Sequence, residues 1–175
     1  CVNVSKNLFD SAVTETSAEV CAEHCGATGC YARPMLPADL EISTDPSRID
    51  LDVVYGFLRT SYWAQTRSRD VVERSIANSI AFGAYTSGRQ VAFARVVTDR
   101  AVFAYLADVF VVPEFRGRGI SKALMRAILA HPDLVGIRMI LLRTQDAHGL
   151  YAQFGFEEVR APAEMMVRML GQAPI

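Results

Sequence analysis

The stretch "VFVVPEFRGRGISKALMRAIL", residues 109–129, carries a strand-like pattern directly into a helical one. Its first four residues are apolar and are followed by Pro113, which has no backbone N–H to donate to a sheet. From Ile120 onward apolar residues recur at helical spacing, with Leu124 and Ile128 on the same face. The stretch therefore predicts a strand, a turn and a helix with one buried face.

The turn between strand and helix is "RGRG", residues 116–119. The first turn of a helix leaves backbone N–H groups unpaired, and the helix macrodipole adds roughly half a positive charge there. Gly117 and Gly119 permit positive φ and leave room for an anion close to these groups. Arg116 and Arg118 add charge and paired donors. The turn is typical of a pyrophosphate-binding site.

Two common phosphate-binding loops do not match this turn. The Walker loop places Lys before Ser or Thr, whereas Lys122 follows Ser121 here. The dinucleotide fingerprint G-x-G-x-x-G needs a third glycine at the position of Lys122. The turn is therefore neither a Walker loop nor a dinucleotide-binding loop.

The rest of the patterned sequence predicts a mixed sheet. Residues 80–112 read as three strands joined by turns at Ser87-Gly88 and Thr98-Asp99, and such short connections imply antiparallel pairing. Asp50 and Ser68 are the expected helix N-caps. The other expected elements are a strand at 40–43, helices from 51 and over 68–79, a strand at 137–144, a helix at 146–155 and strands at 156–162 and 164–170. The fold class is α/β (α+β mixed), in the order β-α-α-β-β-β-α-β-α-β-β, with helices on both faces; the apolar strand 137–144 is expected to be central.

Composition places the chain among soluble globular proteins. Of 175 residues about half are apolar and 21% are charged, and the formal net charge is −1. A near-neutral chain has no strong non-specific attraction to nucleic acid or to an anionic membrane. Apolar runs stay well below the roughly 20 residues of a membrane helix, and the given sequence opens on no secretory leader. We expect a cytoplasmic protein with neither nucleic acid nor membrane as a partner.

All four cysteines stand in the first thirty residues, at positions 1, 21, 25 and 30, with His24 among them. The C-x3-C-x4-C spacing fits no common structural zinc pattern, and nothing indicates an oxidising compartment that would favour disulfides. We expect residues 1–36 to be an N-terminal extension with incidental cysteines and no metal, and residues 37–175 to form one domain.

Two separated motifs resemble those of the GNAT superfamily, the acyl-CoA-dependent N-acyltransferases. The first is "RGRGIS", residues 116–121, after the strand that ends in Val-Val-Pro; it resembles the family's [Q/R]-x-x-G-x-[G/A] loop. The second is "DAHGLYAQFGF", residues 146–156, which is similar to the family's N-x-x-A-x-x-L-Y-x-x-x-G-F segment. Two departures are Ser121, where Gly or Ala is usual, and Thr144, where Asn is usual.

The resemblance implies acetyl-CoA as the co-substrate and no metal. The backbone of Val109, Phe110 and Val111 would pair with the pantetheine arm in the manner of an added strand. The pyrophosphate would bind at Arg116, Gly117, Arg118, Gly119, Ile120 and Ser121. The family's Asn makes one polar contact to the CoA chain, and Thr144 stands at its position.

The resemblance also implies an N-acetyltransferase in which an amine attacks the thioester directly. Tyr151 matches the family's general acid, which protonates the leaving thiolate. Asp108 interrupts an apolar strand and is the candidate base, with pairing to a neighbour such as Arg95 as the alternative. Tyr62, Trp63 and Arg67 are candidates for binding the acceptor, and a core role is the alternative for the two aromatics.

The acceptor amine, a small molecule or a peptide, is not identified by the sequence. A different class of function, a non-catalytic acyl-CoA-binding sensor or regulatory domain, would use the same phosphate turn without chemistry. Homodimers are common in the superfamily, but no sequence feature here tests that state.

Overall fold

The computed structural model describes residues 35–170, which belong to one compact unit. The four cysteines and most of the predicted extension lie outside these residues. The strands are β1 (Glu41–Ser43), β2 (Ile80–Thr86), β3 (Arg89–Thr98), β4 (Phe103–Val111) and β5 (Met139–Leu142). The helices are α1 (Leu51–Leu58), α2 (Arg69–Ala77), α3 (Ile120–Leu129) and α4 (His148–Tyr151), with short 3-10 turns at Pro46–Arg48, Pro113–Phe115, Pro132–Leu134, Ala152–Phe154 and Pro162–Glu164.

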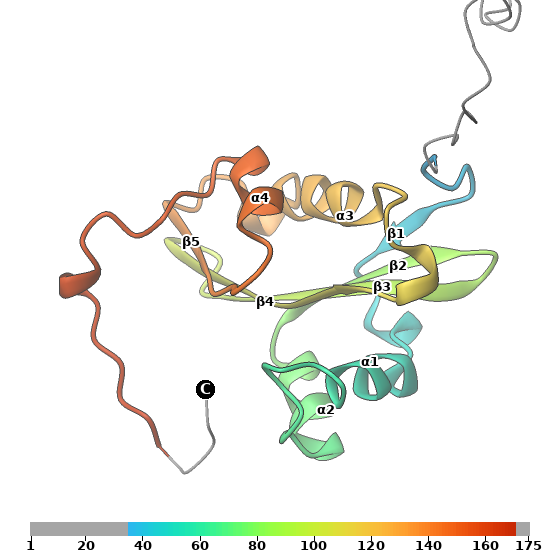
Figure 1. Ribbon diagram of the computed structural model, residues 1–175, viewed down its shortest axis with the longest axis horizontal. Coiled ribbons are helices and arrows are strands. Elements are labelled where there is room, and N and C mark those ends of the chain that lie inside the picture. Colours follow the sequence, from blue (N-terminus) through green and yellow to red (C-terminus); the bar gives the residue numbers. More distant parts are fainter. Residues whose placement is uncertain (1–34, 171–175) are drawn as a thin grey trace, which may run out of the picture. The chain divides into compact units, whose positions relative to one another are not determined.

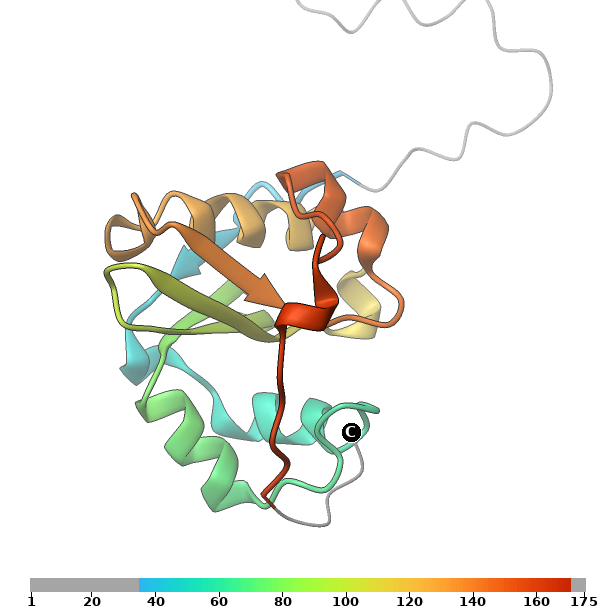
Figure 2. The same ribbon diagram turned by 90° about the vertical axis from the view of Figure 1, so that its left-hand side faces the viewer.

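The five strands form one sheet in the order β1-β2-β3-β4-β5. All neighbours are antiparallel except β4 and β5, which are parallel and joined through α3. Helices α3 and α4 cover one face, and α1 and α2 lie against the other (Figures 1 and 2). The α/β class with a mostly antiparallel mixed sheet and helices on both faces is confirmed.

Local sequence signals account for several element ends. The Asp50 carboxylate accepts hydrogen bonds from the N–H groups of Asp52 (2.9 Å) and Val53 (3.1 Å), so it caps α1 as predicted. Ser68 holds the N-cap position of α2, but its hydroxyl bonds to the Asp70 side chain instead of the backbone. The β2–β3 hairpin turns at the predicted Ser87-Gly88 pair, where φ is +48° and +74°.

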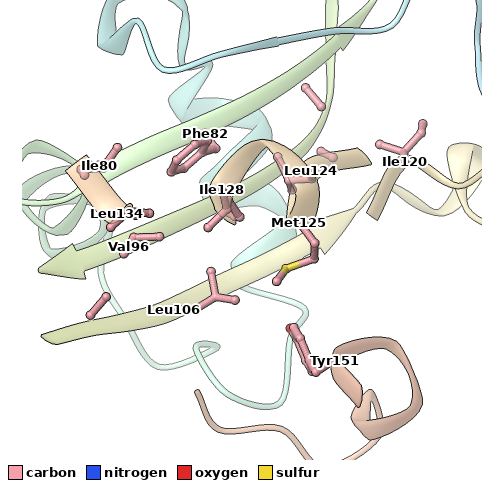
Figure 3. Close-up of a cluster of buried hydrophobic side chains, with 14 of the residues drawn as sticks. Ile80, Phe82, Val96, Leu106, Ile120, Leu124, Met125, Ile128, Leu134 and Tyr151 are labelled. Atoms are coloured by element: carbon pink, nitrogen blue, oxygen red, sulfur yellow. The ribbon is translucent and has the colours of Figure 1, made fainter. Parts of the chain in front are cut away.

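Two apolar clusters hold the layers together. On one face α3 buries Leu124, Met125 and Ile128 completely against β2, β3 and β4 (Figure 3). On the other face Val54 and Leu58 of α1 are buried in a second cluster. Each such side chain contributes about 1.5–3 kcal/mol relative to an exposed one. The single helical stripe predicted after the glycine turn is therefore what fastens α3, and with it the turn, to the sheet.

The two strands predicted at 156–162 and 164–170 are wrong for this structure. Residues 156–170 contain only one 3-10 turn and no strand, and the segment runs beyond β5 toward the loop that follows α1 (Figures 1 and 2). Met166 and Leu170 are 98% and 86% exposed, so their apolar side chains gain nothing from pairing here. A strand forms only when it finds an edge and a face to cover, and the local pattern does not supply them.

The placement of the strand predicted at 137–144 is also corrected. Within residues 35–170 it is shortened to β5, pairs with β4 alone and forms the sheet's edge, with Met139 half exposed. An apolar run predicts that both faces are covered, but it does not say whether both edges are paired.

None of the helices within residues 35–170 combines the length and the apolar character needed to cross a membrane.

Candidate active site

Strand β4 contains a β-bulge at Asp108. Phe93 and Phe110 are partners in the β3–β4 ladder, but the next aligned pair is Arg95 and Ala107, so β4 contains one extra residue. Asp108 has φ +53°, a left-handed conformation that is rare outside glycine but better tolerated by Asp and Asn. Strained backbone of this kind is found at functional sites more often than elsewhere.

The bulge redirects the side chains that follow it. Leu106 packs in the cluster under α3, whereas Phe110, an even number of residues later, packs in the cluster under α1. Its ring stacks on Phe57 with centroids 4.0 Å apart. Strict alternation would have put Leu106 and Phe110 on one face. The bulge therefore lets β4 face both helical layers.

The Asp108 carboxylate is held by two arginines. Arg67 Nη1 lies 2.9 Å from both carboxylate oxygens, and Arg95 Nε lies 2.6 Å from Oδ2. The side chains of Asp108, Arg95 and Arg67 are 2%, 11% and 31% exposed. The pairing with Arg95 that the sequence left as an alternative is present, and Arg67 joins it from the loop between α1 and α2.

Strand β4 has an open edge beyond this point. Its ladder with β5 covers only Phe103–Leu106, so the backbone from Ala107 to Val111 has no β5 partner. The predicted pantetheine contacts at residues 109–111 lie on this open edge. The Val111 carbonyl accepts a hydrogen bond from Arg116 Nε at 3.0 Å, which connects the open edge to the glycine turn.

The glycine turn has the expected geometry. Gly117 and Gly119 have φ +76° and +81°, and Gly119 is the N-cap of α3 with no side-chain cap of its own. A Cβ on Gly119 would meet only Leu36 Cδ1, at 3.8 Å, an ordinary van der Waals contact, so the described residues leave room beside this glycine. Arg118 lies over the Phe115 ring at 5.1 Å. The donors at the start of α3 and the space before them fit a pyrophosphate.

Tyr151, on α4, is buried except for about 8% of its surface and packs edge-on against Phe156. Its side chain points toward β4 at the margin of the core (Figure 3). Burial raises the pKa of Tyr151 to about 12, and the nearby Tyr62 and Asp146 add to the shift. The phenol therefore keeps its proton throughout the neutral range.

Thr144 lies just after β5 and has a local partner. Its Oγ1 accepts a hydrogen bond from the Ala147 N–H at 3.0 Å. This bond satisfies a donor at the start of α4, the helix that carries Tyr151. Thr144 thus supports the position of Tyr151, whatever contact it makes with a ligand.

The predicted acceptor aromatics border the same region. Tyr62 and Trp63 are 45% and 37% exposed and pack edge to face, so neither is a core residue. The Tyr62 hydroxyl accepts a bond from the Gln145 N–H (3.3 Å) and donates to Asp146 Oδ1 (3.4 Å). These contacts join the loop after α1 to the loop after β5.

A cavity of about 380 Å³ lies between these elements. Its lining brings together seven of the predicted site residues: Tyr62, Trp63, Arg67, Asp108, Val109, Thr144 and Tyr151. Residues 116–121 do not line it; they follow the far end of the open β4 edge, where Arg116 bonds to the Val111 carbonyl.

The lining also contains residues that sequence reasoning missed as site residues, namely Tyr105, Arg143, Asp146 and Met169, and Arg95 appears in it beyond its expected pairing role. Arg143 and Asp146 flank Thr144 after an apolar strand, which is a usable signal because charged side chains at a strand end gather at one edge of a sheet. Tyr105 and Met169 carried no such signal. Among residues 35–170 no cluster of His, Cys, Asp or Glu could hold a metal ion.

Comparison with known proteins points to one family. The model of the acetyltransferase (GNAT) domain matches residues 77–158. A solved GNAT-family protein from Xanthomonas campestris is 49% identical, with 77% of this chain and 95% of that one covered, and superimposes with a TM-score of 0.74. A curated acetyltransferase homologue from Gibberella zeae is 28% identical over 70% of this chain and 81% of its own length.

A protein from Clostridium acetobutylicum solved with acetyl-CoA shares the fold, with a TM-score of 0.54, 13% identity, and 69% of this chain and 92% of that one covered.

Proposed function

Because this chain belongs to the GNAT superfamily of acetyltransferases, we propose that it transfers the acetyl group of acetyl-CoA to a primary amine. The observation that carries the proposal is the open edge of β4. It ends at the glycine turn on one side and borders the cavity that contains Tyr151 on the other.

The chain's residues fit the co-substrate along this edge. The α3 start, with Arg116 and Arg118, binds the pyrophosphate, since the turn has donors, charge and space. The backbone of residues 109–111, which has no β5 partner, bonds the pantetheine amides as an additional strand would. The thioester then reaches the cavity beside Asp108, where acceptor and acetyl group meet in one ternary complex.

In the reaction a C–N bond forms, the C–S bond breaks, the amine loses a proton and the thiolate needs one. Tyr151 serves as the donor to the sulfur because its raised pKa keeps the phenol protonated. A thiol has an ordinary pKa near 8.5, so its thiolate is a weak base and a good leaving group. A hydrogen bond from the Tyr151 phenol to the sulfur stabilises the thiolate further as the C–S bond breaks. Holding the two substrates in reacting geometry supplies much of the remaining acceleration.

Asp108 is our candidate for receiving the amine's proton, directly or through water. Its Oδ1 accepts a hydrogen bond from Arg67 alone, whereas Oδ2 is shared by both arginines. Tyr62, Trp63 and Arg67 form the wall along which the acceptor enters.

The cofactor assignment is tested by thermal melting with acetyl-CoA. We expect 1 mM acetyl-CoA to raise the Tm of the unaltered protein and Gly119→Glu to abolish the shift by placing a carboxylate in the pyrophosphate site. Gly136→Glu is the matched control, because Gly136 also has positive φ (+88°) and open space but lies in the loop before β5. A shift that survives Gly119→Glu, or no shift in the unaltered protein, contradicts the assignment.

The chemical role of Tyr151 is tested by Tyr151→Phe. We expect kcat to fall about 100-fold, the lower end of the usual contribution of a general acid, with the acetyl-CoA Tm shift retained. Full activity in this variant would move the acid elsewhere. Retained binding with no turnover of any amine by the unaltered protein would favour the sensor alternative.

A further inference from the structure

The cavity has an excess of positive charge. Three arginines line it, Arg67, Arg95 and Arg143, against the carboxylates of Asp108 and Asp146. A site for a polyamine or another purely cationic acceptor would show the opposite balance, because bringing like charges together opposes binding. The charge of the cavity therefore disfavours purely cationic amines as acceptors.

Both arginines that hold Asp108 have N–H donors that no residue in 35–170 uses. Arg95 bonds to it through Nε alone, and Arg67 through Nη1 alone. Within the described residues no buried side-chain nitrogen or oxygen lacks a hydrogen-bond partner. Their remaining guanidinium nitrogens donate to no residue in 35–170, and both side chains line the cavity. They offer N–H groups to a molecule that enters it.

Arg143 is the third source of donors. It is exposed, lies directly after β5, and has no ion pair or side-chain hydrogen bond with any other residue in 35–170. Asp146 lies three residues further on but bonds to the Tyr62 hydroxyl. A planar guanidinium that has no carboxylate partner among residues 35–170, in a cavity that two further arginines also line, is suited to binding an oxyanion.

We propose that the acceptor is a small amine that also carries an oxyanion, a carboxylate or a phosphate, and that Arg143 binds this group together with the spare donors of Arg67 and Arg95. The inference rests on the proposed acetyl transfer and names its substrate class. The cavity volume lies within the usual range of small-molecule sites, about 300–1,000 Å³. The same positive charge favours the neutral form of the bound amine, which is the form that attacks.

The test uses amines in matched pairs that differ only in the anionic group. L-Phenylalanine is compared with L-phenylalaninamide, L-methionine with L-methioninamide, and O-phosphoethanolamine with ethanolamine, with spermidine as a cationic reference. Release of the CoA thiol is followed. We expect the anionic member of at least one pair to have a kcat/KM about 10-fold or more above its neutral counterpart. The amino-acid pairs and the phosphate pair distinguish the two kinds of oxyanion.

Arg143→Met should remove the preference by raising KM for the anionic member to that of the neutral one. Arg138→Met is the matched control, since this exposed arginine precedes β5 at its other end and does not line the cavity. Equal or better use of the neutral members or of spermidine overturns the inference, and so does a preference that survives Arg143→Met.

Binding supplies a readout that does not depend on turnover. If no amine in the panel reacts, each anionic member is tested at 10 mM for a further Tm increase of the CoA-bound protein, and no increase with any of them also overturns the inference. The Tm shift with acetyl-CoA alone reports on the proposed function separately. A cofactor shift without anion selectivity refutes only the substrate class.

Discussion

Replacing Asp108 by Asn tests the ion-paired centre of the site. Asn has nearly the same shape and tolerates the left-handed backbone at this position, where φ is +53°. The substitution therefore removes the charge with little added strain. It leaves Arg95, 11% exposed, and Arg67, 31% exposed, without their carboxylate partner.

The expected cost follows from these exposures. Breaking a fully buried pair by removing one partner costs about 3–5 kcal/mol, because the other charge stays buried. Arg67 can turn toward solvent and Asn can still accept a hydrogen bond, so we expect about 2–4 kcal/mol. For a chain of 175 residues this corresponds to a Tm about 6–12 °C lower.

The assay is thermal melting by circular dichroism, with urea unfolding to obtain the free energy. Asp133→Asn is the control, because its partner Arg100 is 3.3 Å away and both side chains are exposed; about 1 kcal/mol or less is expected there. Adding Arg95→Met to Asp108→Asn should recover part of the loss, since no unpaired buried charge then remains at that position. If Asp108→Asn is no more destabilising than Asp133→Asn, the reasoning from burial is refuted.

Three further changes test other parts of the structure. Thr144→Val should lower stability by about 1 kcal/mol by removing the bond that supports the start of α4, and an unchanged urea midpoint would argue against that bond. Gly83→Ala should lower the free energy of unfolding by about 1–3 kcal/mol because its Cβ would overlap the Tyr85 ring. Gly56→Ala, in α1 with open space, should raise the free energy of unfolding by about 1 kcal/mol. Equal effects of the two changes in urea unfolding would contradict the packing. The pKa of Tyr151 is raised from 10 to about 12 in the folded state, so its stabilising contribution is complete below pH 10 and is lost as pH rises toward 12. Tyr151→Phe should therefore flatten the fall of unfolding free energy above pH 10, and parallel curves would disprove the burial of that hydroxyl.

Much of the candidate site followed from local patterns. The glycine turn was recognisable because an anion site of this kind needs left-handed backbone and a free helix start within four residues. Gly117 and Gly119 adopt that backbone. The apolar stripe on α3 and the Ser87-Gly88 hairpin were also predictable, because residues close together in the sequence define each of them. Tyr151 was found by resemblance alone; an aromatic residue on a short helix carries no physical signal of chemistry.

Other features required partners that are far apart in the chain. The paired arginines come from positions 41 and 13 residues before Asp108, and neither spacing suggests an ion pair. The bulge that turns Asp108 toward them depends on how β4 packs against two helical layers at once. Residues 156–170 show the converse: apolar residues recur along them, but the segment pairs with no strand of the described structure.

The sequence by itself determined the glycine turn that we propose as the anion site, since a few adjacent residues set its local backbone and its helix start. Only the tertiary structure decided the charge of the cavity and the partners of Asp108. Those depend on side chains from separate elements, which meet only after the sheet and its helices have packed.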